Sequence, residues 1–555
     1  MNVIDLPDRK RTIGPKGDAK MRYNHVFNRN KTPQSLPIPA SSQVPNSAGG
    51  YAWGVDDWTR LARFLVLGSE GGSYYASEPK LTLENAQAVR RCLQADGLRT
   101  VQEIVAVSDA GRAPRNDPAL FALAMCAAYG NDPTRRAALD ALPKVARIGT
   151  HLFHFAEYVN GMRGWGRGLR EGVARWYEGQ SSASALAIQV VKYRQRDGWS
   201  HRDLLRLAHP KTTDAVRNAI YGWVVDGWES VGEEPHPDAV LRTVWAFERV
   251  QQAASEAEAA ALVREYELPM EAVPTEMRGR AVWEAVLPHA GLTFLIRNLV
   301  NLARVGILRK GAWSEVKEIT DRLTDAHQLK RARIHPIQLL SALSVYRQGV
   351  GPRGGSPWIV VPHVLEALDR AFYLSFGNVE SAGGRWVLAL DVSGSMGMGQ
   401  VAGVPGLTPR EAAAAMAMVT CKAEPQVESV AFCDKMTPLS LTRNHRLDDV
   451  LKVTSGLRFG GTDCSLPMRW ALKNRVQADT FVVYTDSETW FGDVHPAQAL
   501  RDYREKTGIA ARLVVVGMVS NGFTIADPND AGMLDIVGFD TSAPEVIRQF
   551  AANRM

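Results

Sequence analysis

The sequence predicts a protein of more than one domain, in which a long all-helical part is followed by a smaller α/β domain. The chain has 555 residues and is 45% hydrophobic, which is enough for more than one core. Across residues 51–364 the apolar side chains recur at helical spacings of three and four. Beyond the glycine-rich segment 349–357, which reads as a linker, β-rich apolar runs alternate with helical segments. This alternation is typical of a mostly parallel sheet covered by helices on both faces.

The helical part predicts an α-solenoid of the HEAT type. Helical spacing is clear in segments 58–65, 120–125 and 244–247, and Gly or Pro residues such as Gly97 and Pro237 divide the region into many short helices. Because no strands intervene, each helix pair would bury its apolar face against the next pair. The sequence contains no clear repeat of fixed length, so the solenoid is predicted only from the succession of helices without strands.

The first 50 residues form a separate basic segment. Up to Lys31 they contain eight Lys or Arg residues against three Asp, and few apolar residues that could form a core. This composition predicts an extended or disordered arm. Two interpretations stay open, an arm that reaches a nucleic acid or another partner and a merely solvated tail.

Composition also excludes several classes of protein. No apolar stretch approaches the roughly 20 residues needed to span a membrane, and the first residues lack a signal-peptide pattern. Five cysteines, without C-x-x-C spacing, argue against a disulfide scaffold and a structural zinc site. A cytoplasmic protein without a membrane partner is therefore expected. The net charge of +6 permits a polyanionic partner but equally fits an ordinary basic protein.

Oxygen-bearing side chains at the ends of two predicted strands form a candidate metal site. The residues are Asp391, Ser393 and Ser395 after the run 386–390, Thr462 further on, and Asp486 after the run 481–484. Ligands of open α/β sheets bind beyond the carboxyl ends of strands, and Mg²⁺ prefers oxygen ligands. Asp391 alone could be a helix N-cap, and Mn²⁺ accepts the same ligands as Mg²⁺. The combination resembles the metal-ion-dependent adhesion site of von Willebrand factor A domains.

Basic residues gather in three places along the predicted solenoid. Lys192, Arg194 and Arg196 precede a predicted helix stop at Gly198, and Lys192 and Arg196 are expected one turn apart on one helix face. Arg202 and Arg206 follow one turn apart on the next helix, which Ser200 and Asp203 would cap. Trp199 and His201 at this corner would suit base stacking. The other clusters are Arg163, Arg167 and Arg170 at positions i, i+4 and i+7, and Lys330, Arg331 and Arg333. One such cluster is usually a solvated helix face, but three on one solenoid favour a nucleic-acid surface.

The string Lys192-Tyr-Arg-Gln-Arg-Asp-Gly-Trp-Ser-His-Arg-Asp-Leu-Leu-Arg-Leu-Ala-His209 resembles the signature of the Ro 60 kDa autoantigen family, the TROVE-domain RNA-binding proteins. The resemblance continues through residues 55–61, 68–75, 297–299, 334–337, 460–468, 485–489 and 520–528. It implies a ring, in which HEAT-like helix pairs form the solenoid and a von Willebrand factor A domain contacts both of its ends. Residues 1–50 would then be the arm, 51–364 the TROVE domain and 365–555 the von Willebrand factor A-like domain. The long arm departs from animal members and suggests a bacterial or phage form.

The resemblance also implies a function. Family members bind small Y RNAs on a basic outer surface and single-stranded ends of misfolded RNAs in a central hole, in noncoding-RNA quality control or as scaffolds. By motif position, His201 with Lys192, Arg194, Arg196, Arg202 and Arg206 matches the outer RNA surface, and Arg167 and Arg170 extend it. An exoribonuclease connected through the RNA and a monomeric protein are further expectations.

Two other functions stay open. The metal site could capture an acidic side chain of a protein partner, or it could support RNA processing. The second is less favoured, because the site offers hydroxyls where a two-metal enzyme would need further carboxylates. Cys464 has no His near it in sequence, and His151 and His154 lie in an apolar helix, where a structural role is expected. No catalytic residue is therefore predicted.

Overall fold

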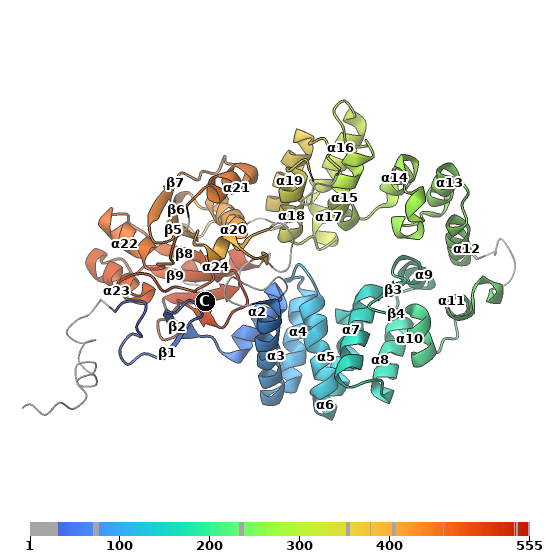
Figure 1. Cartoon of the computed structure of the whole chain (residues 1–555), viewed down its shortest axis with the longest axis horizontal. Coiled ribbons are helices and arrows are strands. Elements are labelled where there is room, and N and C mark those ends of the chain that lie inside the picture. The colour runs from blue at the N-terminus through green and yellow to red at the C-terminus, as the bar shows by residue number, and fades with distance from the viewer. Residues whose placement is uncertain are drawn as a thin grey trace, which may run out of the picture.

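The computed structural model describes residues 32–69, 77–231, 238–350, 356–377, 379–401, 407–458, 460–537, 539 and 542–552. Its elements form a ring (Figure 1), in which a curved row of helices is followed by an α/β domain that lies between the two ends of the row. This arrangement confirms the predicted fold class. None of the described helices is long and apolar enough to cross a membrane.

The row of helices runs from α2 to α19 and packs mainly through neighbours in sequence, such as α5 against α6 and α7, or α13 against α14. Helix α5 is buried on almost every side because its residues are apolar all round. The first helices are α2 (Asp57–Leu67), α3 (Glu78–Ala95), α4 (Gly97–Asp109), α5 (Asp117–Tyr129), α6 (Asp132–Val145), α7 (Gly149–Met162), α8 (Arg167–Glu178), α9 (Ala183–Lys192), α10 (His201–Ala208) and α11 (Ala215–Asp226). The others are α12 (Ala239–Gln251), α13 (Glu256–Tyr266), α14 (Arg280–Val286), α15 (Leu292–Arg304), α16 (Trp313–Leu323), α17 (Ala326–Arg331), α18 (Pro336–Tyr346) and α19 (Pro362–Leu374), with short 3-10 turns η1 (Trp228–Ser230), η2 (Met270–Ala272), η3 (Thr275–Met277) and η4 (Leu287–His289).

The α/β domain is built on a six-stranded sheet of order β11-β9-β8-β5-β6-β7, parallel except for β7. Alternate side chains of β5 enter two cores, Leu388 and Leu390 toward α20 and Val387 and Ala389 toward α22 and α23. The sheet strands are β5 (Arg385–Asp391), β6 (Gln426–Phe432), β7 (Met436–Leu439), β8 (Thr480–Thr485), β9 (Arg512–Gly517) and β11 (Met533–Val537). The helices are η5 (Ser395–Gly397), α20 (Pro409–Ala423), α21 (Leu447–Ser455), α22 (Leu466–Lys473), α23 (Pro496–Thr507) and α24 (Ala543–Ala551).

Part of the N-terminal segment differs from the predicted extended or disordered arm. Residues 1–31 lie outside the described residues, but residues 32–54, here called the N-terminal strap, pack on the α/β domain. Strands β1 (Gln43–Pro45) and β2 (Tyr51–Gly54) form a small antiparallel sheet with β10 (Phe523–Thr524). Ile38 and Trp53 enter the core beneath α23. The prediction was wrong for this stretch because a few apolar residues suffice when another domain supplies the rest of the core.

The α/β domain contacts both ends of the row of helices, as the ring prediction required. At the first end, Arg63 of α2 forms an ion pair with Asp535 of β11 at 2.6 Å. At the last end, Asp369 of α19 accepts a hydrogen bond from the backbone N–H of Leu447 at 2.8 Å. The two ends of the row also touch each other, since Arg333 donates to the carbonyl oxygen of Asp109 at 2.8 Å.

The boundary between the two parts lies later than residue 364. Helix α19 packs against α16 and α18, so the helical part extends to Leu374 and the predicted boundary falls inside this helix. The sheet begins at Arg385. Within the predicted linker 349–357, residues 351–355 lie outside the described residues.

Candidate functional site

The carboxyl ends of β5 and β8 bring the candidate metal ligands together. Asp391 ends β5, and its Oδ2 accepts a hydrogen bond of 2.7 Å from the hydroxyl of Thr485, which ends the neighbouring β8. Its Oδ1 accepts from the backbone N–H of Ser393 at 2.8 Å, so the carboxylate shapes the turn that follows it. The hydroxyls of Ser393 and Ser395 lie 3.1 Å apart, and Ser395 also bonds to the carboxylate of Asp486. Four of the five predicted ligands therefore meet at one edge of the sheet.

Thr462, the fifth, lies on a loop that is held against the loop after β8. Its carbonyl oxygen accepts hydrogen bonds from the backbone N–H groups of Trp490 and Phe491 at 3.1 and 3.0 Å. Sequence spacing could not predict this contact, because it joins residues almost 30 positions apart through the backbone alone.

The two carboxylates are buried together. Burial, and next the negative charge of Asp486, raises the pKa of Asp391 to about 7. Burial likewise raises the pKa of Asp486. Two buried carboxylates with raised pKa values lie next to the hydroxyls of Ser393, Ser395 and Thr485. Such a set of oxygen donors suits a hard divalent cation. Within the described chain, no three residues among His, Cys, Asp and Glu form a metal cluster, so this set depends on its hydroxyls.

Arg410 is a residue of this site that the sequence did not reveal. It lies on α20, and its guanidinium donates to the carbonyl oxygens of Val392 and Ser393 at 3.0 and 3.2 Å. It therefore fixes the backbone of the turn that carries the serines. Nothing in its local sequence distinguishes it from other arginines at a helix start.

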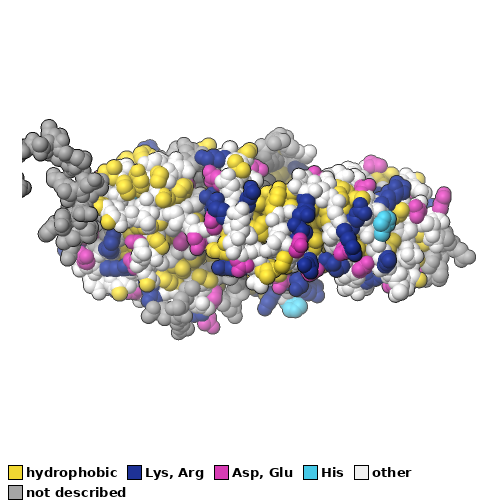
Figure 2. All heavy atoms as spheres, turned by 90° about the horizontal axis from the view of Figure 1, so that it is seen from below, with side chains coloured by type: hydrophobic (Ala, Val, Ile, Leu, Met, Phe, Trp, Pro, Cys, Tyr) yellow, Lys and Arg dark blue, Asp and Glu magenta, His cyan; other side chains and the backbone are white. Residues whose placement is uncertain are grey.

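Helices α8 and α10, which carry most of the predicted RNA-contacting residues, lie along the lower rim of the ring in Figure 1, the side that Figure 2 views from below. Arg167 and Arg170 are on α8, and Arg202 and Arg206 are on α10, where all four side chains are exposed. Arg167 pairs with Glu171 at 2.8 Å. In the described part of the chain, Arg170, Arg202 and Arg206 have no carboxylate within ion-pair distance. Figure 2 shows Lys and Arg side chains gathered on this face, mainly over the half that holds α8 and α10 in Figure 1.

The segment before α10 is a hairpin and not a continuing helix. Helix α9 ends at Lys192, and β3 (Gln195–Arg196) pairs with β4 (Trp199–Ser200). The expectation that Lys192 and Arg196 share one helix face was therefore wrong. The helix also stops at Lys192 and not at Gly198, which lies in the turn of the hairpin. Both Asp197 and Gly198 adopt positive φ, which turns the chain back. Arg194 and Arg196 are exposed on this hairpin, whereas Lys192 is half-buried beside Tyr193.

The predicted capping of α10 is confirmed. Asp203 N–H donates to the hydroxyl of Ser200 at 3.3 Å, and Ser200 N–H donates to the carboxylate of Asp203 at 2.9 Å. The other two clusters differ from expectation. Arg163 follows the end of α7 and does not share α8 with Arg167, and Arg333 is engaged in the contact between the two ends of the row.

His201 lies in the interior and not on the exposed surface that was expected. Only 2% of the residue is exposed, and its Nδ1 lies 2.7 Å from the hydroxyl of Tyr177. Phe153 and Trp176 surround the ring, and burial lowers the pKa of His201 to about 4. The helical wheel explains the error, since His201 shares the inward face of α10 with Leu204 and Leu205. The side chain of His201 therefore does not reach the surface on which Arg202 and Arg206 are exposed.

These observations define the protein as a ring-shaped helical solenoid closed by an α/β domain of the von Willebrand factor A type, with an exposed basic face. Family models agree with both parts, because the TROVE domain matches residues 44–238 and 270–348 and the Ro60 vWA domain matches residues 385–551. The chain belongs to the Ro60 family.

Similar proteins extend this result. The RNA-binding protein RO60 of Deinococcus radiodurans is 48% identical over 92% of this chain and 95% of that protein. The RNA-binding protein RO60 of Caenorhabditis elegans is 35% identical over 95% of this chain and 92% of that protein. The crystal structure of the Deinococcus radiodurans RO (RSR) protein matches with a TM-score of 0.69 and 47% identity, covering 90% of this chain and all of that one.

Proposed function

We propose that the protein binds RNA through the exposed basic residues of α8, α10 and the hairpin before α10. The observation that carries the proposal is the set of exposed arginines Arg170, Arg202 and Arg206, which have no ion-pair partner among the described residues, in a chain whose relatives are named RNA-binding proteins. Phosphate contacts of this kind supply affinity without sequence specificity, so the shape of the RNA must supply the selectivity. The residues proposed to contact phosphate are Lys192, Arg194, Arg196, Arg202, Arg206, Arg167 and Arg170.

The RNA class follows from the family. A structured RNA of the Y type would bind this outer face, because an A-form stem is recognised through its backbone and shape. Single-stranded ends of misfolded RNAs would enter the ring, and the protein would act in noncoding-RNA quality control or as a scaffold that connects an exoribonuclease through the RNA. The protein's own part is binding and orientation, in line with relatives that are named as binding proteins.

We also propose that Asp391, Ser393, Ser395, Thr462 and Asp486 hold a divalent cation, Mg²⁺ or Mn²⁺. The support is the pair of buried carboxylates with raised pKa values beside hydroxyls, since a cation would replace the protons that otherwise neutralise them. The bound cation would offer an open position to an acidic side chain of a partner protein. Trp490 and Phe491, each more than a third exposed beside Thr462, would supply apolar contacts for the same partner.

The test of RNA binding is a salt titration. Arg202→Ala and Arg206→Ala are expected to weaken binding of a stem-containing RNA and to reduce the slope of log affinity against log salt by roughly one for each lost phosphate contact. Arg280→Ala, which removes a half-exposed arginine of α14 paired with Glu284, serves as the control and should leave both quantities unchanged. An unchanged slope in the α10 variants would contradict the proposed surface.

RNA cleavage is tested with the same protein. Labelled RNA incubated with Mg²⁺ is expected to stay intact, and Asp391→Ala is expected to abolish cation binding while most RNA affinity remains. Turnover that disappears in Asp391→Ala would favour the enzyme over the binding protein.

A further inference from the structure

The N-terminal strap lies directly against the loops of the proposed cation site. Gln34 is fully buried, and its side-chain N–H groups donate to Asp463 Oδ1 at 2.5 Å and to the carbonyl oxygen of Val494 at 2.8 Å. Its backbone N–H donates to the carbonyl oxygen of Gly492 at 3.1 Å. One side chain from the far end of the sequence therefore joins the loop that carries Thr462 to the loop that follows Asp486.

A chain of hydrogen bonds leads from Gln34 to a proposed ligand. The hydroxyl of Thr489 lies within donating distance of Gln34 Oε1 and, at 3.2 Å, of the carbonyl oxygen of Thr462. Thr489 is itself fully buried, so water does not compete for these bonds. The position of Thr462 thus depends on Thr489, and the position of Thr489 depends on the strap.

A second part of the strap holds the other side of the same loop. Asn46 donates from its side chain to the carbonyl oxygen of Thr489 at 2.6 Å, and the backbone N–H groups of Ser47 and Ala48 donate to Glu488 Oε2 at 2.8 and 3.2 Å. Gly50 approaches so closely that a Cβ atom there would lie 2.0 Å from the carbonyl oxygen of Thr489. The backbone of the strap at Gly50 is therefore in close contact with the backbone of the loop at Thr489.

Groups that orient metal ligands without touching the metal typically affect affinity by about 10–100-fold. We propose that the strap is a working part of the cation site, in which Gln34 is a positioning residue for the loops that carry Thr462 and Asp486. This inference rests on the cation site of the proposed function. Residues 32–54 would then serve the cation site, a role that is independent of the helical part and of the proposed RNA surface.

Linkage makes the relation reciprocal. If the docked strap raises cation affinity, a bound cation must stabilise the docked strap by the same free energy. The amides of Gln34 and Tyr51, which bond to Gly492 and to Gln34, report on that docking.

The first experiment measures Mn²⁺ binding by calorimetry on the full chain. Gln34→Leu, which keeps the size but removes the amide, is expected to weaken Mn²⁺ binding at least about tenfold. Gln43→Leu is the matched control, because Gln43 lies in the same strap, but among the described residues its side chain bonds to Ile38, Ser41 and His495 and not to the loops at Asp463 or Thr489. It should change the affinity less than about twofold. An equal loss in both variants would overturn the proposal, since it would report only a loosened strap.

A second pair of variants separates positioning from packing. Thr489→Val is expected to weaken Mn²⁺ binding as Gln34→Leu does, whereas Thr489→Ser keeps the hydroxyl and should retain the affinity. Hydrogen exchange supplies an independent readout, in which Mn²⁺ should slow exchange of the amides of Gln34 and Tyr51. Unchanged Mn²⁺ affinity in folded Gln34→Leu protein overturns this proposal alone. No Mn²⁺ binding by the unmodified chain overturns the cation site and this proposal together, while RNA binding is measured separately.

Discussion

At the scale of single residues, buried His201 predicts a dependence of stability on pH. Its pKa is lowered from 6.5 to about 4 because burial disfavours the charged ring. The neutral ring therefore stabilises the fold fully above about pH 6.5, and this stabilisation is lost as the pH falls toward 4. The loss should reach about 3 kcal/mol, since one pKa unit corresponds to about 1.4 kcal/mol.

The measurement is thermal unfolding of wild type and His201→Phe between pH 7 and pH 4.5. The variant loses the bond to Tyr177, so it should be less stable at pH 7, but its melting temperature should fall less steeply with acid. His327→Phe, at an exposed histidine, should keep the wild-type profile. If His201→Phe lost as much stability in acid as wild type does, protonation of His201 would not be the cause of the acid sensitivity.

At this scale, the sequence predicts residues correctly where the topology of the sheet alone brings them together. Asp391, Ser393, Ser395 and Asp486 meet as predicted, because parallel strands end at the same edge of a sheet. Prediction from the sequence was wrong about His201, since a motif gives the identity of a residue but not the direction of its side chain. It could not find Gln34, whose contacts lie more than 400 positions away in the chain.

At the scale of elements, the capping box of α10 should control how this short helix presents Arg202 and Arg206. Ser200→Ala removes the acceptor for the N–H of Asp203 and should destabilise the fold by about 1 kcal/mol. The first turn of α10 would fray, so RNA affinity should fall as well. Hydrogen exchange of the α10 amides and RNA binding measure the two effects.

Ser182→Ala provides the control, because Ser182 caps α9 through the N–H of Ala185 at 3.0 Å. It should cost similar stability without loss of RNA affinity. Equal RNA affinity in the two variants would show that the order of α10 does not matter for binding. Both helix caps can be predicted from the sequence. The hairpin before α10 was missed because Lys192 and Arg196 have helical spacing although α9 ends at Lys192.

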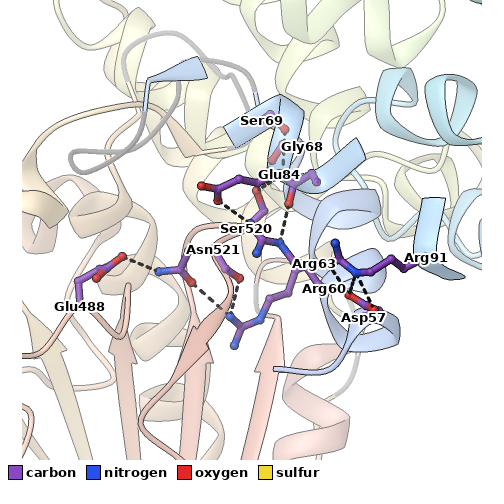
Figure 3. A network of polar contacts seen from close by, with 11 residues as sticks. Asp57, Arg60, Arg63, Gly68, Ser69, Glu84, Arg91, Glu488, Ser520 and Asn521 are labelled. Atoms are coloured by element: carbon purple, nitrogen blue, oxygen red, sulfur yellow. Dashed lines mark hydrogen bonds and ion pairs between the residues drawn. The ribbon is translucent and has the colours of Figure 1, made fainter. Parts of the chain in front are cut away.

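At the scale of the whole molecule, the ring depends on contacts between segments far apart in sequence. Arg63 donates to Asp535, to the carbonyl oxygens of Asn521 and Phe523, and to the side chain of Asn521. Figure 3 shows how Asn521 continues from Arg63 to Glu488, two residues beyond Asp486. The sequence predicts a ring only through its resemblance to a family. No pattern of composition reveals which arginine joins the two domains.

Arg63→Met tests this closure. Arg63 is 1% exposed at its side chain, and its loss would leave Asp535 without its charge partner, which for buried pairs costs about 3–5 kcal/mol. The contact between α2 and the sheet should weaken, so the radius of gyration from small-angle scattering should increase and thermal unfolding should separate into two transitions. Arg91→Met is the matched control in the same region, because Arg91 and Asp57 form a half-exposed pair worth at most about 1 kcal/mol. Adding Asp535→Asn to Arg63→Met should recover part of the lost stability, because it removes the unpaired charge. A single unfolding transition and an unchanged radius of gyration in Arg63→Met would mean that other contacts hold the ring closed.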